Sequence, residues 1–324
     1  MVGGKKTPEI EAKLETLVEQ ETGGDPMSEK KWVRRTLRQL SRALQQLGNQ
    51  VGRTTVGRLL KQQNYSLKTN RKKLTGVPHP DRDRQFKYIR RVKKLFIRAG
   101  YPVISVDTKK KELIGNFHKP GCTWCRQATE VNAHDFPEDA LVRAVPYGIY
   151  DLRHNLGYVY VGTSADTSEF AVDAIATWWK WSQRPTFPQE NKLLILCDAG
   201  GSNGYRFRLW KKQIQECLAD ALGLEVMVCH YPTGASKWNP IEHRLFSYIS
   251  LNWAGQPLHS LDKMLGYIRG TTTESGLKVE AALVEGEYEK GLKVSDAEIA
   301  DFNLVRRRVC PQWNYLLRPR RVSP

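Results

Sequence analysis

The sequence has no long apolar run. None of its stretches approaches the ~20 consecutive apolar residues that a membrane-spanning helix needs, and the basic residues near Met1 are not followed by the apolar stretch of a secretory signal. It also contains no internal repeat and no low-complexity tract. With 40% hydrophobic and 26% charged residues, its 324 residues have the composition of a globular chain of two domains, or of one large domain with an appendage. A membrane span is excluded, and a cytoplasmic location is expected.

Cysteines are few, and disulfides are not expected in a long cytoplasmic chain. Only Cys122 and Cys125 are paired by their spacing. Together with His118 and His134 they form a candidate zinc site, but a lone CxxC pair is a weak signal for zinc. A hairpin that happens to carry two cysteines is the alternative.

Acidic residues are fewer than basic ones, and most of the excess positive charge lies in the first third of the chain. The chain has 51 Lys and Arg against 34 Asp and Glu, a formal charge of +17, and residues 1–100 hold 24 basic and 9 acidic residues, which account for +15 of it. A basic segment with helical periodicity favours a polyanionic partner, most often nucleic acid. A membrane-surface role would require a strong apolar helix face as well.

Two short helices are predicted within this basic region. Apolar residues at spacings of 3, 4 and 3 predict a helix up to Leu47, and Gly48 follows where a helix commonly ends. After a short turn, Thr54 can cap a second helix. Its outer faces carry Arg53, Arg58 and Lys61. This is the helix-turn-helix plan of DNA-binding proteins, and a plain helical hairpin with a solvated basic face is the alternative.

A basic stretch broken by prolines follows the second helix. It includes Arg71, Lys72 and Lys73, which can lie along a phosphate backbone. We interpret it as a linker. The predicted organisation is therefore a small all-α, helical DNA-binding region with its linker over residues 1–80 and a second domain over residues 81–324.

The second domain is predicted to be α/β, because apolar runs alternate with helical patterns. Asp166-Thr-Ser-Glu is a variant capping box with which a helix can open. The predicted strands are residues 103–107, 158–161, 192–198 and 225–230, and the predicted helices are residues 83–98, a helix opening at 166 and residues 205–222.

Two of the predicted strands end in an aspartate. The runs Val-Ile-Ser-Val-Asp107 and Leu-Leu-Ile-Leu-Cys-Asp198 each lead directly into a carboxylate. Since functional sites of open α/β sheets lie at the carboxyl ends of strands, two neighbouring strands of this kind would bring both carboxylates to one hard cation. A helix or turn cap is the alternative for either residue alone.

A third acid follows in Asn239-Pro-Ile-Glu242. Asn239 can cap a helix and Pro240 can occupy its first position, which places Glu242 third, where a capping box would also put it. Together, however, Asp107, Asp198 and Glu242 form the spacing D-x90-D-x43-E. Three such carboxylates are the ligand set that holds two Mg²⁺ ions for in-line phosphoryl displacement.

The chain resembles the Rhodopirellula-type DDE transposases of bacterial insertion sequences over nearly its whole length. The segments that carry the resemblance are residues 64–72 (Asn-Tyr-Ser-Leu-Lys-Thr-Asn-Arg-Lys), 166–172 (Asp-Thr-Ser-Glu-Phe-Ala-Val), 198–206 (Asp-Ala-Gly-Gly-Ser-Asn-Gly-Tyr-Arg), 230–246 (His-Tyr-Pro-Thr-Gly-Ala-Ser-Lys-Trp-Asn-Pro-Ile-Glu-His-Arg-Leu-Phe) and 313–315 (Trp-Asn-Tyr). The resemblance implies an RNase H-like, integrase-type mixed sheet with Asp107, Asp198 and Glu242 as the catalytic and metal-binding triad, served by two Mg²⁺ or Mn²⁺ ions.

The same resemblance implies the reaction and the partners. The expected activity is cleavage and strand transfer of double-stranded DNA at insertion-sequence ends, with terminal inverted repeats and target DNA as partners, by a homo-oligomer assembled on DNA at the nucleoid. Family members usually carry a further helix-turn-helix segment ahead of the Gly-Gly-Lys-Lys at residues 3–6, so a shortened copy is expected. An inactive copy that only binds DNA and a simple metal-dependent nuclease are the alternatives.

Four further residues near the acids are candidates for DNA contact, although solvated surface positions have the same composition. They are Arg206, Lys237, His243 and Arg244.

Overall fold

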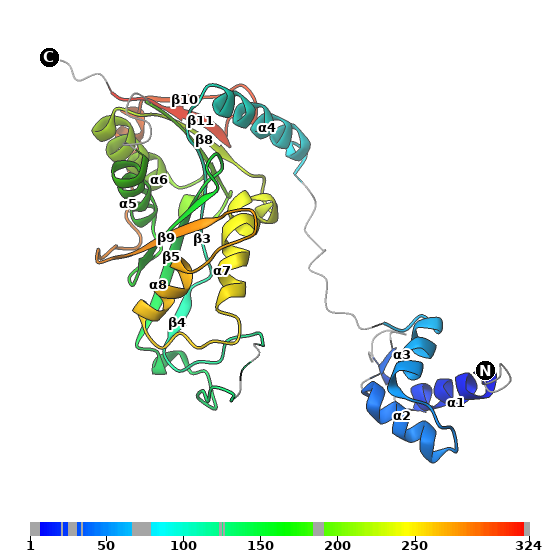
Figure 1. The fold of residues 1–324 in the computed structure, drawn as a ribbon. Coiled ribbons are helices and arrows are strands. Elements are labelled where there is room, and N and C mark those ends of the chain that lie inside the picture. Colours follow the sequence, from blue (N-terminus) through cyan, green and yellow to red (C-terminus); the bar gives the residue numbers. More distant parts are fainter. Residues whose placement is uncertain are drawn as a thin grey trace. The chain divides into compact units, whose positions relative to one another are not determined.

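The computed structural model describes residues 7–20, 22–24, 31–33, 35–66, 79–122, 125, 127–183 and 191–320. The chain divides into two compact units, Met1–Leu74 and Thr75–Pro324 (Figure 1). None of the helices in the described ranges combines the length and the apolar character needed to cross a membrane.

The first unit is built on three helices, α1 (Thr7–Gln20), α2 (Leu37–Gln46) and α3 (Arg53–Gln62). Leu14, Leu40, Leu44 and Leu59 are almost completely buried and form its core. A hairpin of β1 (Thr22–Gly24) and β2 (Lys31–Val33) accompanies the helices. The expected all-α unit omitted this hairpin, whose three-residue strands are too short to leave a periodic signal.

The two predicted helices of this unit are present, but one of their predicted caps is wrong. Gly48 adopts the left-handed conformation, with φ of 83°, that ends α2. Gly52, not Thr54, precedes the first residue of α3, and no side chain caps that helix. The extended backbone of Gly52 starts the helix early, so Thr54 falls inside the first turn.

The second unit contains a mixed sheet of nine strands within the described residues. The order is β10-β11-β8-β7-β3-β5-β6-β9, with β4 paired to β5. Strands β3, β7 and β8 run parallel, as do β6 and β9, and the other pairs are antiparallel. The strands are β3 (Val103–Thr108), β4 (Glu112–Ile114), β5 (Val142–Asp151), β6 (Leu156–Gly162), β7 (Lys192–Cys197), β8 (Glu225–His230), β9 (Lys278–Val284), β10 (Leu304–Arg306) and β11 (Asn314–Leu317).

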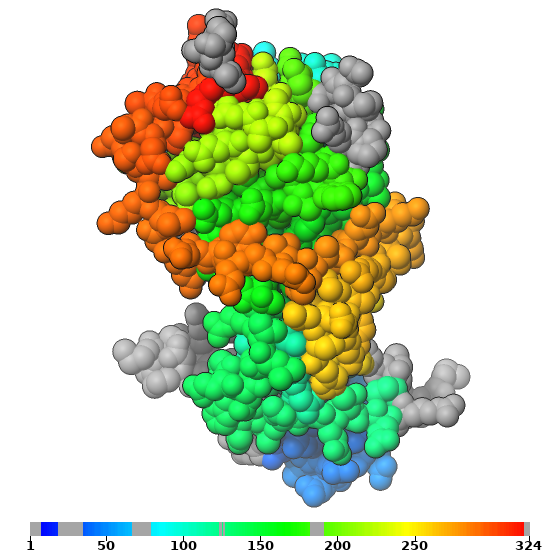
Figure 2. Space-filling model, turned by 90° about the vertical axis from the view of Figure 1, so that its left-hand side faces the viewer, coloured from blue at the N-terminus to red at the C-terminus, as the bar shows by residue number. Residues whose placement is uncertain are grey.

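Helices cover both faces of this sheet (Figure 1). One face packs against α5 (Ser168–Trp178) and α6 (Arg208–Gln213), the latter continued by the π-helical residues Ile214–Asp220. Figure 2 shows these two helices lying side by side over the sheet. The other face is covered by α4 (Arg82–Arg98), α7 (Ser247–Asn252) and α8 (Leu261–Arg269), and a short helix, α9 (Asp296–Ala300), lies near the end of the chain.

Strand β7 shows why these strands are continuously apolar. Leu193 and Ile195 pack on the α5 face, whereas Leu194 and Leu196 pack on the α4 face. Parallel strands that are buried on both faces need apolar residues at every position. In β3 the same alternation puts Ile104 and Val106 on the α5 face, so Ser105 and Asp107 belong to the α4 face.

Candidate active site

Asp107 and Asp198 are brought together by the register of two parallel strands. The β3–β7 ladder pairs Ser105 with Leu196 and ends at Val106 and Cys197. The residue that follows each of these is an aspartate. Because neighbouring strands lie about 4.8 Å apart, this register places Asp107 and Asp198 side by side at the carboxyl ends of the strands. The pairing of the two strands meets the condition under which the sequence predicted that the two carboxylates come together.

Glu242 is attached to the same strand through a buried polar latch. The helix that carries Glu242 begins at Pro240, is π-helical over Glu242–Phe246 and continues into α7. The fully buried side chain of Asn239 accepts a hydrogen bond from Ser105 Oγ at 2.5 Å and donates one to the backbone carbonyl of Val106 at 3.2 Å. Ser105 Oγ in turn accepts from the backbone N–H of Ile241 at 3.1 Å. The latch ties the helix start to β3, two residues from Asp107.

The helix begins at Pro240, directly after Asn239, as predicted, but the side chain of Asn239 does not serve as its cap. That side chain hydrogen-bonds to Ser105 and Val106 of β3 instead. The hydroxyl of Ser105 accepts a hydrogen bond from the N–H of Ile241 at the start of the helix. The buried amide takes the partners that tertiary packing supplies, since an unpaired polar group in the interior costs about 1–3 kcal/mol.

Burial raises the pKa of all three carboxyls, and repulsion from neighbouring carboxylates raises the pKa of Asp107 and of Asp198 further. Burial, and then the nearby Asp198 carboxylate, raise the pKa of Asp107 from 3.8 to about 8, against a hydrogen bond from the Thr108 N–H at 2.8 Å. Burial, and then Glu242, raise the pKa of Asp198 to about 6, while Asn239 lowers it. Burial also raises the pKa of Glu242. The ionised form of the cluster is therefore unfavourable by itself, and a bound cation would stabilise it.

The donor set fits a hard divalent cation. All three candidate ligands are carboxylates, which Mg²⁺ prefers. Asp198 Oδ1 is buried and meets no hydrogen-bond donor among the described residues, and such an oxygen is suited to a metal. Within the described ranges no three His, Cys, Asp or Glu side chains are drawn together as a closed metal group.

A fourth carboxylate, Asp166, stands beside the cluster. Thr108 Oγ1 donates to Asp166 Oδ1 at 3.0 Å and lies 3.2 Å from the hydroxyl of Ser202, in the glycine-rich turn after Asp198. The predicted capping role of Asp166 is wrong, because Thr167 caps α5. Only the folded chain brings Thr108 to Asp166, so no local spacing could have revealed this contact.

Behind Asp198, a buried hydrogen-bond chain is centred on His230. The β7–β8 ladder ends at Cys197 and His230, so the Asp198 carbonyl lies beyond it. His230 Nδ1 donates to this carbonyl at 2.8 Å, and Nε2 accepts from the Tyr315 hydroxyl at 2.9 Å. The same hydroxyl accepts from Trp210 Nε1 at 2.9 Å. The side chain of His230 thus fixes the position of the Asp198 backbone just beyond the last paired residues of the two strands.

Lys109 places a buried cation next to Glu242. Burial lowers the pKa of Lys109, and its charge lowers the pKa of Glu242. Glu112 accepts from Lys109 at 3.1 Å and from Lys119 at 2.6 Å, and all three side chains are nearly buried. No pattern in the sequence pointed to this group, although Lys109 is only two residues from Asp107.

The four predicted DNA contacts near the acids are exposed. Arg206 stacks on Tyr205 in the loop that follows Asp198. Lys237 lies 4.2 Å from the ring centre of Trp238, and His243 hydrogen-bonds to the backbone carbonyl of Lys237. Lys237, His243 and Arg244 flank Glu242 on both sides along the chain.

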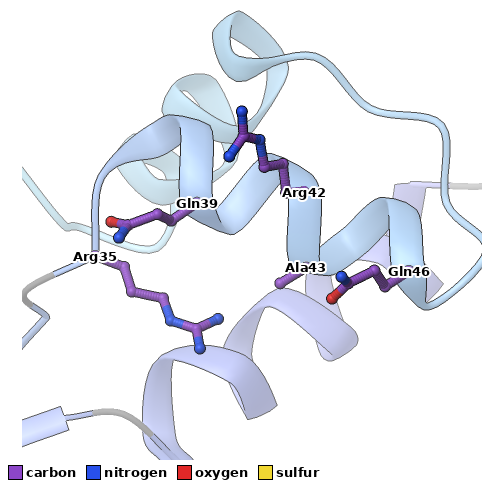
Figure 3. Close-up of a pocket in the computed structure, with 5 residues that line it drawn as sticks. All are labelled: Arg35, Gln39, Arg42, Ala43 and Gln46. Atoms are coloured by element: carbon purple, nitrogen blue, oxygen red, sulfur yellow. The ribbon is translucent and has the colours of Figure 1, made fainter.

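In the first unit, Arg53, Arg58 and Lys61 are exposed on α3. Arg71, Lys72 and Lys73 lie outside the described residues. A shallow polar pocket runs along α2 of this unit (Figure 3), and its lining residues are Arg35, Gln39, Arg42, Ala43 and Gln46. Their guanidinium and amide groups supply hydrogen-bond donors suited to phosphates and base edges.

Cys122 and Cys125 are exposed free thiols. No zinc-type group of three ligands that includes them is found in the described part of the chain.

Comparison with known proteins gives one family. The family model described as the Rhodopirellula transposase DDE domain matches residues 13–319. No curated protein matches the chain. Among solved structures, the chain is similar to the Mos1 transposase paired-end complex with the left transposon end, at 14% identity and a TM-score of 0.44, over 80% of this chain and 69% of that one. It is also similar to the mariner Mos1 paired-end complex with Mg, at 13% identity and a TM-score of 0.43, over 83% and 73% of the two chains.

Proposed function

This chain belongs to the Rhodopirellula transposase DDE domain family and is a DDE transposase, as the sequence predicted, and we propose that Asp107, Asp198 and Glu242 are the carboxylates with which it cleaves and joins DNA strands. The proposal is supported above all by the strand register that sets Asp107 opposite Asp198. The Ser105–Asn239 latch adds Glu242 to the same edge of the sheet. Besides burial, Asp198 and Glu242 raise the pKa of Asp107, and Glu242 raises the pKa of Asp198, as carboxylates that share a site do.

In this proposal the three carboxylates hold two Mg²⁺ or Mn²⁺ ions. When bound, such ions polarise the scissile phosphate and make a water or a 3′-hydroxyl a stronger nucleophile. The chain's own residues prepare the site. His230 fixes the backbone of Asp198, Asn239 fixes the start of the Glu242 helix, and the exposed cations Lys237 and Arg244 attract the phosphates of the strand.

The N-terminal region, residues 1–80, is proposed to bind the inverted repeats at the element ends. Exposed Arg53, Arg58 and Lys61 on α3, together with the polar groups along α2, provide donors for DNA. The catalytic domain, residues 81–324, would act on the bound end as part of a homo-oligomer assembled on the DNA.

A plasmid cleavage assay tests the proposal. Supercoiled plasmid carrying the element ends is incubated with the full chain and Mg²⁺ or EDTA, and nicked, linear and strand-transfer products are separated. We expect products with Mg²⁺ only. They should be lost in Asp107→Asn, Asp198→Asn and Glu242→Gln and kept in Asp262→Asn, whose exposed carboxylate in α8 is a matched control.

Each remaining outcome corresponds to another function. Nicked products without any strand transfer would indicate a simple nuclease. Binding to element ends without Mg²⁺-dependent products would indicate an inactive copy that only binds DNA. Cleavage that survives all three substitutions would place the metal site elsewhere.

A further inference from the structure

The outer face of α4 carries a row of cations that the active-site proposal does not use. Arg84, Lys87, Arg91, Lys94 and Arg98 follow one another at spacings of 3, 4, 3 and 4 residues, and all five are exposed. Such spacing places side chains along one side of a helix. At about 1.5 Å per residue, the stripe is roughly 20 Å long.

The stripe lies opposite the face by which α4 packs on the sheet. Gln85, Ile89 and Val92 are buried against the strands, and a helical period of 3.6 residues puts the stripe on the far side from them. Figure 1 shows α4 at the border of the unit, beside β8 and β11. The stripe therefore faces away from the core.

The five cations of the stripe have little anionic charge beside them. Asp83 is the only acidic residue of α4, and Arg84 pairs at 3.7 Å with Asp81, the residue before the helix. Like charges three or four residues apart destabilise a helix by a few tenths of a kcal/mol per pair. A row of such pairs lowers the stability of the helix, and a polyanion bound along it would neutralise the repulsion.

A second basic element adjoins the stripe. Burial raises the pKa of the Tyr88 phenol, whereas Arg307, which is hydrogen-bonded to it, and Arg91 act in the opposite direction. Arg307 belongs to the exposed Arg306-Arg-Arg segment near the C-terminus. Two cationic segments more than two hundred residues apart in the sequence thus meet on one surface.

The N-terminal end of α4 lies near the segments that lead to the carboxylates. At the N-terminal end of α4, Gln85 Nε2 donates to the backbone carbonyl of His230 at 2.8 Å. The guanidinium of Arg82 lies 4.6 Å from the ring centre of Trp238, four residues before Glu242. DNA lying along the stripe would therefore run toward the catalytic edge of the sheet.

We propose that the α4 stripe, with Arg307 beside it, binds the phosphate backbone of duplex DNA without regard to base sequence and guides that DNA to the active site. The inference rests on the proposed function, because it assumes that DNA is the substrate. A duplex carries about one negative charge per 1.7 Å of its axis, counting both strands, so the length of duplex beside a stripe of roughly 20 Å carries about a dozen phosphates, of which those on the near side can be contacted. Lysine and arginine side chains that bind phosphates fix position and carry no sequence information.

The test measures how DNA affinity depends on salt. Binding of the full chain to a random-sequence duplex without element ends is followed by fluorescence anisotropy in EDTA at several salt concentrations. The stripe variant is Lys87→Gln/Arg91→Gln/Lys94→Gln. The matched control is Lys278→Gln/Lys290→Gln/Lys293→Gln, which removes three exposed lysines elsewhere in the same unit.

We expect the slope of log affinity against log salt to become shallower by about 2.7 in the stripe variant, because each neutralised phosphate contributes about 0.9 to the slope, and to change little in the control. An unchanged slope, or an equal change in both variants, would overturn the proposal. Circular dichroism checks folding, and Arg84→Gln/Arg98→Gln serves as a second variant at the ends of the stripe. If the wild type cleaves plasmid while both stripe variants bind as it does, only this inference fails, whereas absence of cleavage by the wild type counts against the proposed function.

Discussion

Asp107 and Asp198 occupy matching positions, one residue beyond the last paired residues of two parallel neighbouring strands. Asp198 Oδ1 is buried without a hydrogen-bond donor among the described residues. When both carboxyls are ionised, they repel each other. The stability of the fold should therefore depend on pH and on whether a cation is bound between them.

The first prediction concerns pH and stability in EDTA. The pKa of Asp107 is raised from 3.8 to about 8, so its contribution to stability is greatest below the unfolded-state pKa and is lost as the pH rises through about 8. Asp107→Asn should therefore raise the thermal midpoint of the metal-free protein at pH 8 and have little effect near pH 4. Thermal melts across that range measure this, and a lower midpoint at pH 8 would argue against a repulsive pair.

The second prediction separates a ligand from a helix cap at Glu242. Glutamine would keep a capping hydrogen bond but lacks the charge that a hard cation requires. We expect Glu242→Gln to reduce Mg²⁺-dependent cleavage by roughly 100-fold or more with an unchanged or higher melting temperature. Rate and melting temperature are measured on one preparation. Near wild-type cleavage would remove Glu242 from the metal site.

The third prediction tests the Ser105–Asn239 latch. Ser105→Ala removes the hydroxyl that donates to the side-chain Oδ1 of Asn239 and accepts from the backbone N–H of Ile241. We expect a loss of about 1–3 kcal/mol in the free energy of unfolding, measured by urea denaturation. Asn239→Ala and the double variant complete a cycle. Additive losses would mean that the two side chains do not act together.

The fourth prediction follows from the buried histidine. Burial lowers the pKa of His230 from 6.5 to about 4, so its contribution to stability is present above pH 6.5 and is lost as the pH falls through about 4. His230→Asn, which can keep a donor near the Asp198 carbonyl, should flatten this acid limb of the stability curve. Urea unfolding at several pH values between 4 and 7 measures the slope. An identical slope in the variant would contradict a neutral buried imidazole.

The fifth prediction distinguishes the N-terminal helices from the α4 stripe. Arg53→Gln/Arg58→Gln/Lys61→Gln should reduce the preference of the full chain for element-end DNA over random duplex by about tenfold or more, because base contacts carry the sequence information. The stripe variant should weaken both duplexes alike. Competition binding measures the two ratios, and an unchanged preference would mean that α3 does not read the ends.

Much of the catalytic unit could be predicted from local sequence. Strands β3, β7 and β8 are buried on both faces, and such strands are continuous apolar runs that periodicity detects. Strand β5 was missed because it contains Pro146, a residue that argues against a central strand. Strand β9 was missed because its side chains are largely exposed.

Local sequence was enough to place Asp107 and Asp198 where two apolar runs end, because an apolar run and the residue that follows it are adjacent in the chain. That the two strands are neighbours in parallel register depends on packing between distant segments of the chain. The hydrogen bond between the Asn239 side chain and β3 depends on packing too, because Ser105 is 134 residues away along the chain. A local pattern records which hydrogen bonds a residue can make, whereas burial decides which of them it does make, because each buried polar group takes the partner that packing brings within reach.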